Sequence, residues 1–254
     1  MDSASMTEIP GHFPSVPRPV ADSPPDPAQA LPAVYAGLRA FARPLLSRLF
    51  DLRVTGLGHV PVRGPFVVAA NHANYLDGVV LGAVLSRKIA FLVMPRVYHA
   101  SPLHPALHRH IGSIRIDPSR PDPAAVRRAL RVLATGGVLG IFPEGPHGWA
   151  GHLAPGQAGV AVIALRSGVP VVPAGITGTF EALAGRRWHI PRRVPLRLRF
   201  GRPLCFAWPA RRALARAVRS EVTRRIMTEI AALLVENRCA PAATGVSIAR
   251  GGWR

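Results

Sequence analysis

Residues 65–94 have the sequence PFVVAANHANYLDGVVLGAVLSRKIAFLVM, in which two apolar runs enclose a segment with a helical pattern. The runs at 65–70 and 88–94 predict strands, and the segment at 76–86 predicts a helix between them. A strand followed by a helix and another strand is typical of an α/β domain built around a parallel sheet. The fold class follows if the same alternation continues along the chain.

The alternation continues as far as residue 237. Helices are predicted at 104–111, 122–136, 159–168 and 209–237, and strands at 113–116, 137–142, 170–176 and 195–201. The helix at 122–136 begins with Asp122 and Pro123 and ends at Gly136, which are typical boundary residues. We therefore predict a single α/β domain over residues 54–238, with a largely parallel mixed sheet flanked by helices.

The chain is strongly basic, with a formal net charge of +19 over 254 residues, and Lys88 is its only lysine. Such a charge favours polyanionic partners. Thirteen arginines lie between Arg186 and Arg225, against one acidic residue, Glu221. We expect this stretch to face an anionic membrane surface, with a solvated basic face as the alternative. Nucleic acid is not expected, because aromatic residues are sparse there and no nucleic-acid motif is present.

The two ends of the chain differ from its middle. Residues 1–30 are rich in Pro, Ser and Asp and predict a disordered tail, and residues 239–254 resemble them. Residues 31–53 predict a basic amphipathic helix that Pro44 should kink or split. Its apolar side would be formed by Val34, Leu38, Phe41, Leu45 and Leu49. This helix can lie in a membrane interface or pack on its own domain, and the two arrangements are compatible.

The stretch NHANYLD at 71–77 places His72 five residues before Asp77. Asn74 followed by Asp77 resembles a capping box, which predicts that the helix begins at Asn74. His72 then lies in the loop before the helix, where Asp77 can bond its imidazole and raise its basicity. Such a pair can take a proton from a hydroxyl, whereas helix capping alone is the alternative.

Three further stretches are candidates for a site. In GIFPEGPHG, residues 140–148, a strand ends in Pro143, Glu144 and Gly145, which indicates either a ligand-lining carboxylate or an ordinary turn. The apolar stretch at residues 166–179, RSGVPVVPAGITGT, predicts a segment of the hydrophobic core. His104 and His108 have a spacing that can bind zinc on a helix, but no acidic or cysteine ligand is near them in the sequence, so no metal is expected.

Together these stretches resemble the phospholipid and glycerol acyltransferase family, which contains the 1-acylglycerol-3-phosphate acyltransferases. Four family blocks appear in order, as NHANYLD, GSIRID, FPEG and VPVVPAGI, within residues 50–205. The resemblance implies a glycerol-3-phosphate acyltransferase-like fold. It also implies acyl transfer from acyl-CoA or acyl carrier protein, as co-substrate, to a hydroxyl of a glycerol lipid. We expect the acceptor to be 1-acyl-sn-glycerol-3-phosphate, without any cofactor, at the cytoplasmic face of the cell membrane.

The resemblance also implies roles for individual residues. His72 would be the general base and Asp77 would orient it, while backbone N–H groups near the start of the following helix could stabilise the oxyanion. Glu144 and Gly145 would help to bind the lysophospholipid acceptor. Asn71, Gly112 and Pro173 lie in the first, second and fourth blocks, which would shape the substrate pocket.

Two arginines of the family pattern are missing. Pro146 and His147 stand where the family has Thr-Arg, and Pro118 stands where it has an Arg. Those arginines hold the acceptor phosphate in the family. We expect Arg115 and Arg120 to replace them with help from His147, since the fork of Arg suits phosphate. The alternatives are an acceptor without a terminal phosphate and a catalytically inactive lipid-binding relative.

Overall fold

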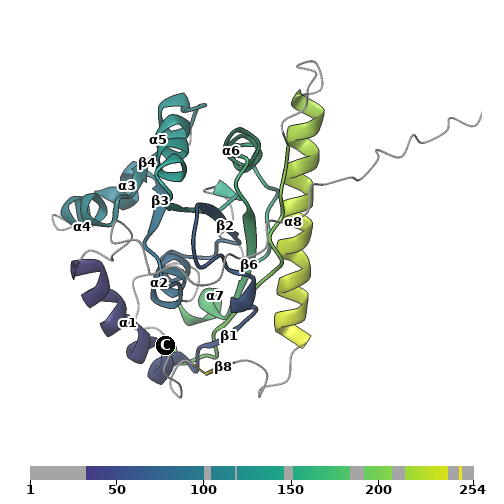
Figure 1. The fold of residues 1–254 in the computed structure, drawn as a ribbon. Coiled ribbons are helices and arrows are strands. Elements are labelled where there is room, and N and C mark those ends of the chain that lie inside the picture. Colours follow the sequence, from purple (N-terminus) through teal and green to yellow (C-terminus); the bar gives the residue numbers. More distant parts are fainter. Residues whose placement is uncertain are drawn as a thin grey trace, which may run out of the picture.

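One central sheet organises the chain in the computed structural model, and helices cover both of its faces (Figure 1). The structure describes residues 33–99, 104–117, 119–145, 151–183, 192–207, 215–239 and 246–247. The tail predicted at 1–30 lies outside the described residues. Within the tail predicted at 239–254, Val246–Ser247 form a short strand that pairs with Arg53 and Val54.

The sheet has eight strands in the order β4-β3-β5-β2-β6-β7-β1-β8. The pairs β4–β3, β3–β5, β5–β2, β2–β6 and β7–β1 are parallel, whereas the pairs β6–β7 and β1–β8 are antiparallel. The predicted α/β class with a largely parallel mixed sheet is therefore confirmed. The strands are β1 (Arg53–Thr55), β2 (Phe66–Ala70), β3 (Ile89–Val93), β4 (Ile114–Arg115), β5 (Val138–Ile141), β6 (Val171–Thr177), β7 (Arg197–Phe200) and β8 (Val246–Ser247).

Most helices fall where the pattern predicts them, and the short elements β1, α3, α7 and β8 were not predicted. The helices are α1 (Ala33–Phe50), the 3-10 helix η2 (Leu57–His59), α2 (Tyr75–Val84), α3 (Pro95–Tyr98), α4 (His104–Ile111), α5 (Pro123–Ala134), α6 (Gly159–Ser167), α7 (Thr179–Ala182) and α8 (Ala215–Cys239). No helix among the described residues is long and apolar enough to cross a membrane.

Strand β2 is buried along its whole length and separates two hydrophobic cores. Phe66, Val68 and Ala70 face one core, which includes residues of α1 and α2. Val67 and Ala69 face the other, which includes residues of α5, α6 and α8. A parallel strand covered on both faces needs a continuous apolar run, which is why FVVAA shows no alternation.

Helix α1 is one continuous helix and leaves part of its predicted apolar side exposed. Pro44 lies inside the helix and does not divide it. The buried residues are Tyr35, Leu46 and Phe50. The face built from Leu38, Phe41 and Leu45 is instead exposed, with Phe41 70% accessible. Packing of the other side against the domain stabilises the helix and offsets the hydrogen bond that Pro44 cannot donate.

The candidate site lies at the end of the sheet where three adjacent parallel strands have their carboxyl ends. Strands β5, β2 and β6 lie side by side, and their carboxyl ends share this edge. Ligands of open α/β sheets usually bind at such an edge. The first and third family blocks follow β2 and β5, which the topology therefore brings together.

Candidate active site

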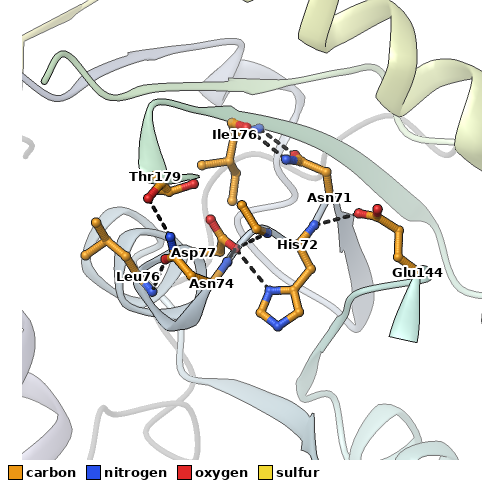
Figure 2. A network of polar contacts seen from close by, with 9 residues as sticks. Asn71, His72, Asn74, Leu76, Asp77, Glu144, Ile176 and Thr179 are labelled. Atoms are coloured by element: carbon orange, nitrogen blue, oxygen red, sulfur yellow. Dashed lines mark hydrogen bonds and ion pairs between the residues drawn. The ribbon is translucent and has the colours of Figure 1, made fainter. Parts of the chain in front are cut away.

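His72 and Asp77 meet where the chain leaves β2 and turns into α2 (Figure 2). His72 Nδ1 lies 3.0 Å from Asp77 Oδ2. The Asp77 side chain is fully buried, whereas 17% of the His72 side chain is exposed. Because a carboxylate only accepts, Nδ1 carries the hydrogen and Nε2 is the nitrogen that can take a proton. Figure 2 shows the imidazole projecting out of the polar network.

Asp77 also shapes the turn in front of the helix. Its Oδ2 accepts hydrogen bonds from the backbone N–H of Ala73, at 2.7 Å, and of Asn74, at 2.8 Å. Asn74 caps α2, since its Oδ1 accepts a hydrogen bond from Leu76 N at 2.9 Å. The predicted capping box is confirmed. One carboxylate therefore fixes both the start of α2 and the orientation of His72.

The same capping box removes candidates for the oxyanion site. The backbone N–H groups of Ala73 and Asn74 donate to Asp77, and those of Leu76 and Asp77 donate to Asn74. The prediction that N–H groups at this helix start stabilise the oxyanion is wrong for these four, because they already have partners.

Asn71 and Asn74 tie this turn to the end of β6. Asn71 Oδ1 accepts from Ile176 N at 2.7 Å, and its Nδ2 donates to Ile176 O at 2.9 Å. Asn74 Nδ2 donates to the carbonyl of Thr179, the first residue of α7. Both ends of the Asn71 amide thus pair with backbone, and the residue is buried. In the structure its side chain joins β2 to β6, so it supports the pocket rather than facing it.

Glu144 is buried beneath the turn, with 1% of its surface exposed. Its Oε1 accepts from His72 N at 2.7 Å, and its Oε2 accepts from Ala154 N at 2.6 Å. Burial raises the pKa of this carboxyl, although both N–H bonds act in the opposite direction. Both oxygens are occupied by backbone groups, so Glu144 clamps the His72 backbone to the segment that precedes α6.

Gly145 makes the turn after Glu144 possible. Its φ of 64° is left-handed, and a Cβ here would lie 2.3 Å from Gln157 Nε2. Gln157 N in turn donates to Pro143 O at 2.8 Å. Glycine is therefore required by the backbone and by the close approach of Gln157. Gln157 carries no motif signal in the sequence, and its place beside Gly145 emerges only in the structure.

Phe142, from the FPEG block, contacts the histidine directly. Its ring stacks on the His72 imidazole with centroids 4.1 Å apart and planes 15° from parallel. The family blocks imply no role for this residue. The signal that could reveal it is the register of β2 and β5, in which Ala69 pairs with Ile141. The next pair is then Ala70 and Phe142, with His72 two residues further on the same face.

Other predicted residues lie away from His72. β4, which follows Gly112 and contains Arg115, is separated from β2 by β3 and β5. The Arg115 guanidinium lies over the Tyr98 ring, 5.2 Å from its centroid. Arg120 Nε contacts Asp117 Oδ2 at 2.9 Å, with 79% of the Arg120 side chain exposed.

Neither Pro173 nor His147 is described beside His72. Pro173 packs on the α8 face of the sheet, opposite His72, since its neighbours in alternation are Val171 and Gly175. His147 lies outside the described residues. Within the described part of the chain, no group of three or more His, Cys, Asp or Glu side chains is arranged to hold a metal ion.

A family model described as Acyltransferase matches residues 51–177, half of the chain. The chain belongs to the acyltransferase family. The match covers His72, Asp77 and Glu144, the residues that form the polar network of Figure 2.

Known relatives of this acyltransferase include lipid enzymes. A 1-acyl-sn-glycerol-3-phosphate acyltransferase of Bacillus subtilis is 25% identical over 135 residues, which cover 53% of this chain and 66% of the relative. The enzyme of the same name from Limnanthes douglasii is 28% identical over 157 residues, covering 60% of this chain and 54% of the relative. The chain thus spans roughly half to two thirds of the length of these curated relatives.

A solved structure shares the fold. The crystal structure of the 1-acyl-sn-glycerophosphate (LPA) acyltransferase PlsC from Thermotoga maritima matches with a TM-score of 0.68 at 21% identity. The match covers 82% of this chain and 81% of that one. This likeness places the acyltransferase fold over most of the chain.

Proposed function

We propose that this protein transfers a fatty acyl group from acyl-CoA or acyl carrier protein to a free hydroxyl of a lysolipid, with His72 as general base. The observation that carries the proposal is the contact of His72 Nδ1 with the buried Asp77 carboxylate, which leaves Nε2 as the partly exposed basic nitrogen. The names of the relatives favour 1-acyl-sn-glycerol-3-phosphate as the acceptor.

In the proposed reaction, Nε2 takes the hydroxyl proton while the acceptor oxygen attacks the thioester carbonyl carbon. The tetrahedral intermediate then collapses, the C–S bond breaks, and the thiol leaves with the proton returned from His72. Asp77 stabilises the imidazolium that exists between these two proton transfers. The acyl group passes directly to the acceptor, so no acyl-enzyme is formed.

The acceptor head group is the finer part of the proposal. Phosphate recognition by Arg115 and Arg120 would require both side chains to leave the partners described above, Tyr98 and Asp117. Both side chains are exposed, so exchanging these contacts for a phosphate would cost little. The alternative acceptor is a lysolipid without a terminal phosphate. Purified protein assayed in parallel with lysophosphatidic acid and lysophosphatidylcholine separates the two. Turnover of lysophosphatidylcholine alone would remove the phosphate acceptor from the proposal.

The central experiment is His72→Ala. General-base catalysis contributes about 100- to 10,000-fold, so we expect kcat to fall by about that factor while the circular dichroism spectrum and the thermal midpoint stay close to wild type. His59→Ala is the matched control, since His59 lies in η2 and bonds a backbone carbonyl, Phe200 O of β7, which is two strands away from β2. A His72→Ala protein with wild-type turnover would overturn the proposed mechanism.

The proposal includes a membrane surface as partner and the cytoplasmic face of the membrane as location. Lipid substrates lie in a bilayer, and a net charge of +19 favours anionic head groups. The exposed side chains of Leu38, Phe41 and Leu45 on α1 could enter the interface.

A further inference from the structure

Three aromatic rings lie in a row on one face of the sheet, beside the contact between His72 and Asp77. The His72 ring lies on Phe142, and Phe142 in turn lies 5.8 Å from Phe91, with planes 7° apart. The rings come from the ends of β2 and β5 and from within β3, which are neighbours in the sheet. The proposed reaction assigns no role to either phenylalanine.

The sequence of β5 creates the room for this stack. Gly140 pairs with Phe91, and a Cβ on Gly140 would lie 2.4 Å from Phe91 Cε1. The missing side chain lets the Phe91 ring lie over β5, beside Phe142. Phe91 and Phe142 both pack against the core that includes α1 and α2. Core residues therefore support the two phenylalanine rings, and one face of the Phe142 ring contacts His72.

We propose that Phe142 is a positioning residue for His72, whose ring sets the plane of the imidazole and lies against the imidazolium formed during transfer. The proposal rests on the assigned role of His72 as general base. The bond to Asp77 fixes one ring atom, Nδ1, and by itself lets the imidazole tilt about that contact. Contact with the flat face of Phe142 removes the tilt, so Nε2 keeps one direction.

The electronic character of Phe142 adds a second effect. The face of a phenyl ring is the negative side of its quadrupole, so it attracts a cation more than a neutral ring. His72 is neutral before it takes the proton and cationic afterwards. Phe142 therefore stabilises the protonated state that accompanies attack on the thioester, and this preference raises kcat rather than substrate affinity.

The test compares three variants. Phe142→Leu keeps an apolar side chain but removes the ring, Phe142→Tyr keeps the ring, and Phe206→Leu removes a phenylalanine from the core on the opposite face of the sheet. Each variant is assayed for kcat and KM. In each, NMR of histidine-labelled protein records the ring-proton shifts of His72, assigned by their loss in His72→Ala, because a stacked phenyl ring moves them upfield.

We expect Phe142→Leu to lose the upfield shift and to lower kcat about tenfold with KM nearly unchanged, the scale of a partly desolvated cation–π contact. Phe142→Tyr should keep both the upfield shift and the wild-type kcat, and Phe206→Leu should change neither. Loss of the shift with kcat unchanged, or no upfield shift in the wild type, overturns the proposal. Failure of the proposed function looks different, because the wild type would then show no turnover, or His72→Ala would be as active as the wild type.

Discussion

Asp77 is the residue on which the site depends most. Its Oδ2 accepts three hydrogen bonds, from His72, Ala73 and Asn74, and its buried carboxylate carries the negative charge that faces the imidazole. We predict that Asp77→Asn lowers kcat at least about 100-fold, because a neutral amide no longer stabilises the imidazolium and, if its NH2 turns toward Nδ1, it reverses the tautomer. Steady-state assays measure this. Asp122→Asn, which changes the helix-capping carboxylate of α5, should keep wild-type kcat, and an equal loss there would contradict a specific role for Asp77.

Glu144 gives a stability prediction with a definite sign. Burial raises the pKa of its carboxyl above 4.5, so the folded protein binds this proton more tightly than the unfolded chain does. The stabilisation from this group is then complete below pH 4.5 and is lost as the pH rises through the folded-state pKa. The free energy of unfolding of wild type minus that of Glu144→Gln should therefore decrease as the pH rises above 4.5, as measured by urea denaturation.

The control for Glu144 has the opposite sign. The hydrogen bond from Arg224 lowers the pKa of the exposed Glu221 carboxyl, so its stabilisation is present at higher pH and is lost on acidification. The difference between wild type and Glu221→Gln should rise with pH, and only slightly, because the pair is solvated. Parallel trends for the two glutamates would contradict the desolvation of Glu144.

The residue-level predictions succeeded where chemistry is local. Asn74 and Asp77 lie three residues apart, so the capping box could be read from the sequence and it placed His72 correctly before the helix. The positions of Glu144 and Phe142 depend on partners 72 and 70 residues away, His72 in both cases. Their contacts follow from strand register, which no local pattern reveals.

Strand β5 carries a prediction at the scale of the element. A methyl group on Gly140 would overlap the Phe91 ring and approach Ile89 Cγ2 at 2.8 Å. Gly140→Ala should therefore destabilise the protein by about 1–3 kcal/mol, the usual cost of overpacking a core. Gly37→Ala on α1 has nothing within 4 Å and should be neutral or slightly stabilising. Urea denaturation measures the free energy of unfolding of both variants. If Gly140→Ala were as stable as Gly37→Ala, the Phe91 ring would be able to move aside without cost, and the prediction would be wrong.

Helix α1 shows how an apolar pattern can mislead at this scale. The helix has apolar residues on more than one side, so periodicity alone cannot choose which side is buried. The structure buries Tyr35, Leu46 and Phe50, and Tyr35 OH accepts from Ile89 N at 3.4 Å. Packing on the domain therefore uses one side of α1 and leaves the predicted apolar side exposed, so the two arrangements considered from the sequence remain compatible.

At the scale of the whole molecule, the order of the strands decides which helices share a face of the sheet with His72. Alternating strands and helices sufficed to predict the α/β class, but the order of the strands depends on long-range pairing and came only from the structure. That order places α1, α2 and the His72–Phe142 stack on one face of the sheet, with α5, α6 and α8 on the other. A flat bilayer that delivers substrate to His72 would thus meet α1 before α8.

Binding to vesicles tests this arrangement. We predict that Phe41→Ser lowers binding to phosphatidylglycerol–phosphatidylcholine vesicles about tenfold, because Phe41 is 70% exposed and would lose the gain of burying a phenyl ring in the interface. Val235→Ser removes an exposed apolar side chain from α8 and should leave binding unchanged. Cosedimentation measures both. A larger loss for Val235→Ser would place the membrane on the α8 face, where the arginines rather than the α1 side chains would contact the lipid.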